Sequence, residues 1–235
     1  MTTVSNIDAS GYLLHSHKYT DSKVILRIFT REHGRISAIY RNSKKGLKVK
    51  PFTELSVEVR GSRELLTVRS LDEISPAHYL LGRSLFCGMY LNEILVRLLP
   101  ERQANELVYD NYRETLTKLS QADKNNQLQE VLLRRFELTL LAALGLGISL
   151  ERDCNDKDIR SDVDALYYFQ QGGGWRPVAL GENANMSNLF SGQDIADIRR
   201  QNWRGGSLRA AKRLCRLALH PLLGDKPLKS RELFS

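Results

Sequence analysis

Strict alternation of apolar and polar residues near the N-terminus is the feature that most constrains the fold. The stretches SKVILRIFT (22–30), RISAIY (35–40) and ELSVEVR (54–60) each place alternate residues on one apolar side. A period of two is typical of half-buried antiparallel strands. Five short strands close together predict a small barrel of the OB or SH3-like kind. We expect them at about 11–17, 22–30, 35–41, 53–60 and 65–70.

The longest gap between these strands, 42–52, holds most of a run of cations. The stretch YRNSKKGLKVK (40–50) has no acid, and residues 23–50 hold nine Lys or Arg against one acid. A flexible basic loop of a barrel is suited to follow a phosphate backbone. The alternative is a solvated loop with Phe29 and Phe52 in the core, and both interpretations stay open. The candidate phosphate-binding residues of the barrel are Arg35, Arg41, Lys44, Lys45, Lys48 and Lys50.

The apolar period becomes helical after Pro76. A helix is expected from about residue 82 until Pro100 ends it, and a second at about 102–120. A third, at 127–147, is apolar on most faces, which is typical of a central, buried helix. The chain therefore belongs to the α+β class: a five-stranded barrel followed by a mainly α-helical part.

The C-terminal third predicts one hairpin and two more helices. Strand-like YYF and WRPV flank a triple glycine at 172–174, which indicates a β-hairpin. Ser191 is the expected N-cap of one helix. Ser207 is the expected N-cap of the next, and Pro221 is expected just beyond its end.

The last of these helices, SLRAAKRLCRLALHPLL (207–223), combines an apolar stripe with a basic side. No acid interrupts the basic side, whereas solvated helix faces usually mix signs. We expect this side to extend the phosphate-binding surface. The alternative is an exposed face whose cations lie over the core. The four residues are Arg209, Lys212, Arg213 and Arg216.

Two adjacent arginines precede the most apolar part of the third helix. A cation beside accessible apolar side chains can bind the carboxylates of an acidic peptide tail. The alternative is a helix-surface ion pair with Glu130 or Glu137, and both stay open. The candidates for tail binding are Arg134, Arg135, Leu133 and Leu141.

Charge is distributed unevenly over a chain whose net charge is +8. Residues 1–80 carry +5, residues 81–198 carry −5 and residues 199–235 carry +8. Basic ends make nucleic acid, an acidic lipid surface or an acidic protein tail plausible partners. No transmembrane stretch or secretory signal is visible, and three scattered cysteines make no disulfide framework. A cytoplasmic protein is expected.

Catalytic and metal-binding patterns are weak. His15 and His17 share one face of a predicted strand but have no evident third metal ligand, so a strand-surface pair is favoured. Cys154 lies among aspartates, which raise the pKa of a thiol and disfavour a nucleophile. We expect no enzyme, no metal and no cofactor.

Three stretches resemble the bacterial RecO family of recombination mediators. They are GYLLHSHKYTDSKVILRIFTREHGRISAIYRNSKK, LRRFELTLLAALG and SLRAAKRLCRLALHPLLGDKPLKSREL, and they occur in the family's order over about residues 10–234. The resemblance implies an OB-fold domain at 1–80 and a helical domain at 81–235 with a β-hairpin inserted near 150–182. Many members carry a four-cysteine zinc site around CNDKD (154–158), where this chain has only Cys154, so we expect no zinc.

The resemblance also implies a function in DNA repair. Such a protein binds single- and double-stranded DNA and anneals complementary strands. With RecR it helps to load RecA on strands coated by single-strand binding protein, whose acidic C-terminal tail it binds. Its location is then at the nucleoid, without a membrane. Two other functions remain open, an RNA-binding OB protein and a scaffold that binds acidic protein tails only.

Overall fold

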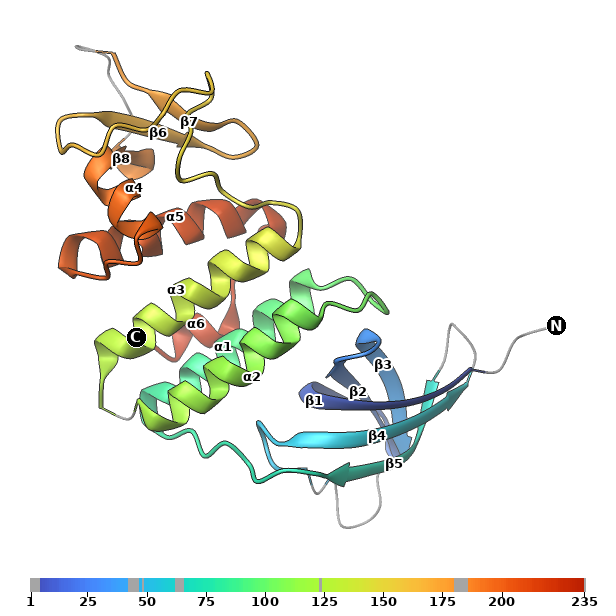
Figure 1. Cartoon of the computed structure of the whole chain (residues 1–235). Coiled ribbons are helices and arrows are strands. Elements are labelled where there is room, and N and C mark those ends of the chain that lie inside the picture. The colour runs from blue at the N-terminus through green and yellow to red at the C-terminus, as the bar shows by residue number, and fades with distance from the viewer. Residues whose placement is uncertain are drawn as a thin grey trace. The chain divides into compact units, whose positions relative to one another are not determined.

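The structure is a computed structural model, and it describes residues 5–41, 47, 49–61, 66–122, 124–179 and 186–234. The chain forms two compact units, both visible in Figure 1. The first contains residues 1–129 and 227–235, and the second contains residues 130–226. The last nine residues therefore return to the unit that holds the N-terminus. The expected division at residues 80 and 81 stays a prediction about which parts fold independently.

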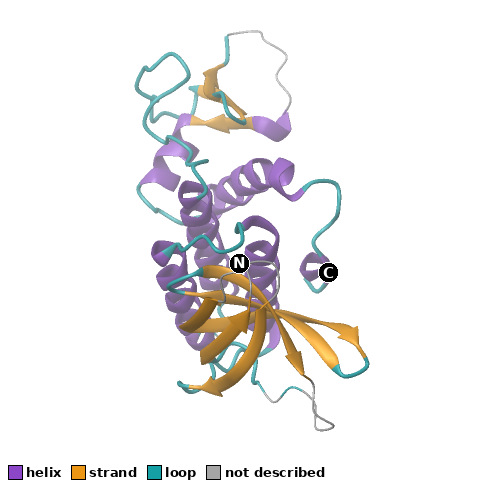
Figure 2. Ribbon diagram, turned by 90° about the vertical axis from the view of Figure 1, so that its right-hand side faces the viewer, coloured by secondary structure: helices purple, strands orange, loops and turns teal. Residues whose placement is uncertain are grey.

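Five strands form a closed barrel in the first unit, drawn in orange in Figure 2. Their order is β1-β2-β3-β5-β4, and only the β3–β5 pair is parallel. This is a five-stranded OB barrel, so the α+β prediction with an N-terminal OB fold is confirmed. The strands are β1 (Ser5–Thr20), β2 (Lys23–Thr30), β3 (Gly34–Arg41), β4 (Glu54–Gly61) and β5 (Leu66–Glu73).

Alternation decides which side chains fill the barrel. Even-numbered residues of β2 and β3, such as Leu26, Ile28 and Ile36, are fully buried in the core. Their odd-numbered neighbours therefore face outward. The predicted alternation is confirmed, but β1 is longer than the expected 11–17. It is long because its first half pairs with β4 and its second half with β2.

Helix α2 (Glu106–Gln121) packs on the barrel through an aromatic cluster formed by Tyr12, Phe29, Tyr109 and Tyr112, whereas helix α1 (Gly82–Leu98) contacts β1. The measured centroid separations in the cluster lie between 5.2 and 6.3 Å. All four rings are essentially buried. Phe52 is buried as well, so the expected burial of Phe29 and Phe52 is confirmed, whereas the solvated loop of the same alternative stays untested.

The second unit contains a small antiparallel sheet of order β7-β6-β8. Its strands are β6 (Leu166–Gln170), β7 (Gly174–Pro177) and β8 (Leu189–Ser191). The predicted hairpin is β6 and β7. The sequence did not indicate β8, because three residues are too few to show a period. A 3-10 helix η1 (Met186–Asn188) precedes β8.

The helices of the second unit are α4 (Gly192–Arg199), α5 (Gly205–Leu223) and the larger part of α3 (Asn126–Ala143). Helix α3 ends before the predicted residue 147, because Gly145 is left-handed at φ +77°. A last short helix, α6 (Lys229–Glu232), belongs to the first unit. Within the described part of the chain, no helix is both long and apolar enough to cross a membrane.

Helix ends follow the predictions in part. Ser191 is the N-cap of α4, and its hydroxyl accepts the Asp194 amide at 3.1 Å. The prediction that Ser207 is an N-cap is wrong, because α5 begins two residues earlier with Arg204 as N-cap. The Ser207 hydroxyl instead accepts the Arg204 N–H at 3.0 Å. The placement of Pro221 beyond the helix is also wrong, since α5 continues to Leu223.

Gly34 tests the contact between the barrel and the segment that joins α1 to α2. Its φ is +66°, and an added Cβ would lie 1.9 Å from the Gln103 carbonyl oxygen. We expect Gly34→Ala to lower the free energy of unfolding by about 3 kcal/mol or more, because strain and overlap add. Calorimetric melting measures this. The control is Gly206→Ala in α5, where nothing lies within 4 Å, and equal melting of both variants would contradict the expectation.

Candidate nucleic-acid interface

OB barrels bind oligonucleotides on the outer face of their second and third strands. In this barrel the β2–β3 register pairs Lys23 with Arg41, Ile25 with Ile39 and Arg27 with Ser37. These side chains point away from the barrel core, because the alternate residues fill it, and of the six only Ile39 is itself buried, at 8% exposed. None of the six is acidic. We call this surface the β2–β3 face, and its residues are Lys23, Ile25, Arg27, Ser37, Ile39 and Arg41.

Arg41 is the predicted barrel cation that the structure places on the β2–β3 face, and it is exposed. Lys50 is also exposed, but its ammonium lies 3.7 Å from a carboxylate oxygen of Glu73. Three more candidates, Lys44, Lys45 and Lys48, lie outside the described residues. Their part in binding stays a prediction.

Arg35 is committed to contacts inside the first unit. Its Nε donates to the Leu99 carbonyl at 3.0 Å, and Nη1 pairs with Glu101 at 3.0 Å. Only 14% of its side chain is exposed. Glu101 also accepts the Ser37 hydroxyl at 2.5 Å. Arg35 therefore anchors β3 to the segment that precedes α2, which leaves it poorly placed for phosphate.

Lys23 and Arg27 were missed as site residues. Both stand on the β2–β3 face, Lys23 opposite Arg41 and Arg27 between His15 and Ser37. The signal was present in the sequence, because the alternation of SKVILRIFT puts Arg27 on the side opposite Leu26 and Ile28. Position on a strand therefore identifies outward-facing cations that a search for basic runs overlooked.

The four predicted cations of α5 differ in whether they are exposed or contact other groups of the protein. Arg209 and Arg216 are exposed. Lys212 pairs with Glu130 at 3.2 Å. Arg213 lies 4.3 Å from the Phe190 ring centroid and donates to the Leu189 carbonyl at 2.6 Å. Two of the four are therefore available to a ligand, and the other two hold the second unit together.

Three further cations of the second unit were missed. Arg199 and Arg200 end α4, Arg204 caps α5, and all three are exposed. They surround a tight turn in which the Asn202 side chain donates to Asp197 at 3.0 Å. Together with Arg209, they make the turn between α4 and α5 strongly basic.

The arginine pair on α3 separates into one buried and one exposed member. Arg134 pairs with Glu137 at 2.9 Å, and their side chains are only 7% and 1% exposed. This is the ion-pair alternative, although the pair is buried and not on the helix surface. Leu133 and Leu141 are also buried. Arg135 alone among the four candidates is exposed.

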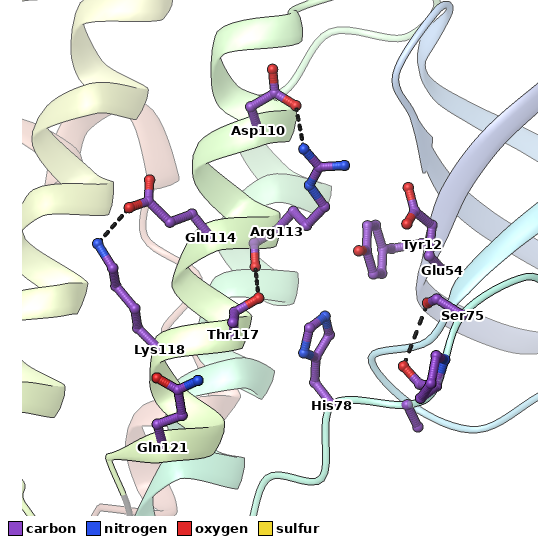
Figure 3. Close-up of a pocket in the computed structure, with 12 residues that line it drawn as sticks. Tyr12, Glu54, Ser75, His78, Asp110, Arg113, Glu114, Thr117, Lys118 and Gln121 are labelled. Carbon is purple, nitrogen blue, oxygen red and sulfur yellow. Dashed lines mark hydrogen bonds and ion pairs between the residues drawn. The ribbon is translucent and has the colours of Figure 1, made fainter.

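A groove of about 890 Å³ lies between the barrel and α2 within the first unit, as Figure 3 shows. Its charged groups are of both signs, since Asp110 and Glu114 lie beside Arg113 and Lys118. Arg113 is 3.5 Å from Asp110. Burial lowers the pKa of His78, partly opposed by Glu54. Because positive and negative groups are mixed, the groove has no continuous positive potential that would attract a polyanion. It is therefore a poor match for a phosphate backbone.

The described residues hold no cluster of three or more metal-ligating side chains. One buried thiol and two buried phenols are held in their protonated forms. Burial, together with the nearby Glu137, raises the pKa of the Cys215 thiol well above its usual value. Burial likewise raises the pKa of the Tyr12 and Tyr109 phenols.

The segment around Cys154 is held by its own polar side chains. A carboxylate oxygen of Asp153 accepts the amides of Asn155 at 2.8 Å and Lys157 at 3.0 Å. Arg152 lies 3.5 Å from Asp158, and the Cys154 amide donates to the Trp175 carbonyl. These contacts tie the loop to the small sheet through hydrogen bonds and charge.

Comparison with known proteins identifies the family. The model for the N-terminal part of recombination protein O matches residues 1–77, and the model for its C-terminal part matches residues 82–232. A DNA repair protein RecO of Stutzerimonas stutzeri is 41% identical, with 95% of this chain and 92% of the relative covered. RecO proteins of Pseudomonas putida and Pseudomonas paraeruginosa are 40% and 38% identical, over 95% of this chain and 95% and 92% of their lengths. The chain therefore belongs to the RecO family of DNA repair proteins.

Proposed function

We propose that this chain is a recombination mediator that binds single- and double-stranded DNA through its barrel and anneals complementary strands. The observation that carries the proposal is the β2–β3 face, which presents Lys23, Arg27 and Arg41 without an acid among its residues. Cations gathered on one face neutralise phosphates of two DNA strands and so reduce the repulsion between the strands. Phosphate contacts carry no base specificity, so pairing between the strands does the recognition.

Protein partners belong to the same proposal. The chain acts with RecR to load RecA on strands coated by single-strand binding protein, and it binds the acidic tail of that protein. The support for tail binding is Arg135, which is exposed on α3. Leu138 and Ala142 share its helix face by spacing and are not buried, so they replace the buried Leu133 and Leu141 as apolar contacts. The protein acts as a mediator and not as an enzyme, at the nucleoid.

Salt dependence of DNA binding tests the barrel surface. We expect Lys23→Ala/Arg27→Ala/Arg41→Ala to flatten the log–log salt slope for a single-stranded oligomer by about 2, since each phosphate contact contributes about 0.7. Fluorescence anisotropy across a salt series measures it. A variant with Lys44, Lys45, Lys48 and Lys50 changed to Ala tests the loop in parallel.

The matched control removes three ion-paired cations elsewhere, Lys118, Arg152 and Arg160, and should keep the slope. If the log–log salt slope flattens only in Arg209→Ala/Arg216→Ala, the DNA-binding site lies on α5 and not on the barrel. Tight binding of RNA in preference to DNA would favour the RNA-binding alternative. Binding of acidic peptide without any oligonucleotide binding would favour the scaffold.

Tyr19 tests how the barrel distinguishes single strands. It is 57% exposed near the β1–β2 turn, beside the strands that carry Lys23 and Arg41. An exposed ring next to a basic groove stacks on unpaired bases, which is worth about 1–3 kcal/mol per base. We expect Tyr19→Ala to weaken single-strand binding about fivefold or more and duplex binding much less. The control is Tyr79→Ala, a 70% exposed ring away from the β2–β3 face; equal losses for both strand forms would contradict the stacking role.

Arg135 tests the tail site. We expect Arg135→Ala to weaken binding of an acidic C-terminal peptide about tenfold, because a charge-assisted hydrogen bond is lost, while DNA binding stays within twofold. Titration calorimetry with the peptide measures this. Arg134→Ala is the contrasting variant, since breaking its buried pair with Glu137 costs about 3–5 kcal/mol of stability. Unchanged peptide binding in Arg135→Ala would exclude this surface.

A further inference from the structure

Two histidines stand side by side on the outer face of β1. The register of β1 shifts between Leu13 and His15, and Leu14 turns inward, where it is 6% exposed. The Leu14 carbonyl accepts the Asn92 side chain of α1 at 3.2 Å. A bulge of this kind re-aims the residues that follow it. Here it leaves His15 and His17 exposed, with ring centroids 5.9 Å apart.

Arg27 extends this pair into the β2–β3 face. It is the direct cross-strand partner of His15, and directly opposite side chains on a sheet have Cβ atoms about 5 Å apart. The histidines therefore lie next to the DNA-binding surface proposed above.

Lys229, near the end of the chain, lies close enough to His15 for its charge to lower the pKa of that imidazole. Helix α6 lies against α1 (Figure 1), and a Glu93 carboxylate fixes its start. Glu93 accepts the backbone amides of Lys229 at 3.0 Å and Ser230 at 2.8 Å, and the Ser230 hydroxyl at 2.6 Å. Leu228 is only 2% exposed. The position of Lys229 is thus set by hydrogen bonds and by packing.

A protonated His15 is repelled by Arg27 and Lys229 in the absence of an anion. Burial lowers the pKa of His15, and Arg27, His17 and Lys229 lower it further, against a smaller opposing effect of Glu93. Glu93 is the acid that faces the cluster. Its pKa is lowered, because the hydrogen bonds from Ser230 and Lys229 outweigh its burial. Its charge is therefore already engaged in holding α6.

We propose that His15, His17, Arg27 and Lys229 form a phosphate-binding site that holds the backbone of a DNA strand where it leaves the β2–β3 face, more tightly as pH falls. The inference rests on the proposed function and adds its regulation. Three elements, β1, β2 and α6, supply four nitrogen-bearing side chains to one surface, and a phosphate relieves their repulsion.

The direction of the pH effect follows from linkage. A bound phosphate favours the imidazolium forms, so it raises the histidine pKa values above those of the free protein. Binding then takes up protons, and affinity rises as pH falls through the range near and below about 6.5. At pH 8 the His15 imidazole, whose pKa is lowered, is neutral, and Arg27 and Lys229 carry the charge beside it.

The test compares oligonucleotide affinity at pH 8 and pH 6 by anisotropy at constant ionic strength. We expect about tenfold tighter binding at pH 6 for the unmodified protein. His15→Gln/His17→Gln should match it at pH 8 and lose most of the increase. His78→Gln is the control, because that imidazole also belongs to the first unit but lies in the groove of Figure 3. An undiminished increase in the double variant would overturn the proposal.

A second measurement separates this site from DNA binding in general. Histidine proton resonances are followed against pH in inorganic phosphate and in chloride of equal ionic strength. A rise of the His15 and His17 pKa values in phosphate, reduced in Lys229→Gln, supports the site even if no oligonucleotide binds and the proposed function fails. Histidine pKa values that do not respond to phosphate would overturn the site and leave the proposal for the β2–β3 face unaffected. Loss of the pH 6 increase with an oligomer whose backbone is uncharged identifies the DNA phosphates as the ligand.

Discussion

The packing of the aromatic cluster is the interaction on which the rest of the first unit depends. Tyr12 and Phe29 from the barrel meet Tyr109 and Tyr112 from α2. Each α2 tyrosine is also hydrogen-bonded, Tyr109 to Glu54 at 2.8 Å and Tyr112 to Asn92 at 2.5 Å. Buried aromatic pairs add about 0.5–1.5 kcal/mol beyond their area. The cluster covers one end of the β1–β2 outer surface and leaves the other end for a ligand.

This division decides what each barrel cation does. Near the cluster, Arg31 pairs with Asp110 at 2.7 Å, and Arg35 pairs with Glu101 at 3.0 Å. Beyond it, Lys23, Arg27 and Arg41 lie on strands whose outward residues include no acid. The barrel arginines thus have different surroundings: Arg31 and Arg35 join the barrel to the helical part of the first unit, whereas Arg27 and Arg41 belong to the surface proposed to bind phosphate.

Local pattern therefore predicted the barrel well and the site only in part. Alternation identified the buried residues, because burial on a strand has a period that five residues already show. It could not distinguish Arg35 from Arg41, since the groups that bind Arg35, Leu99 and Glu101, lie more than 60 residues away along the chain. The same holds on α3, where Glu137 is visible at helical spacing from Arg134 but the burial of the pair is not.

The two structural units divide the charge of the chain differently from the order of the sequence. The sequence has two basic ends and an acidic middle, yet the units cut across that division. Lys229 and Arg231 join the barrel unit, whereas the cations of α5 belong to the other unit, along with most of the acidic middle. The first unit then carries +6 and the second +2. Most of the excess charge is thus concentrated in the barrel unit, where the bulge at Leu14 and the α6 contact to Glu93 add two histidines and a lysine to the side proposed to bind phosphate.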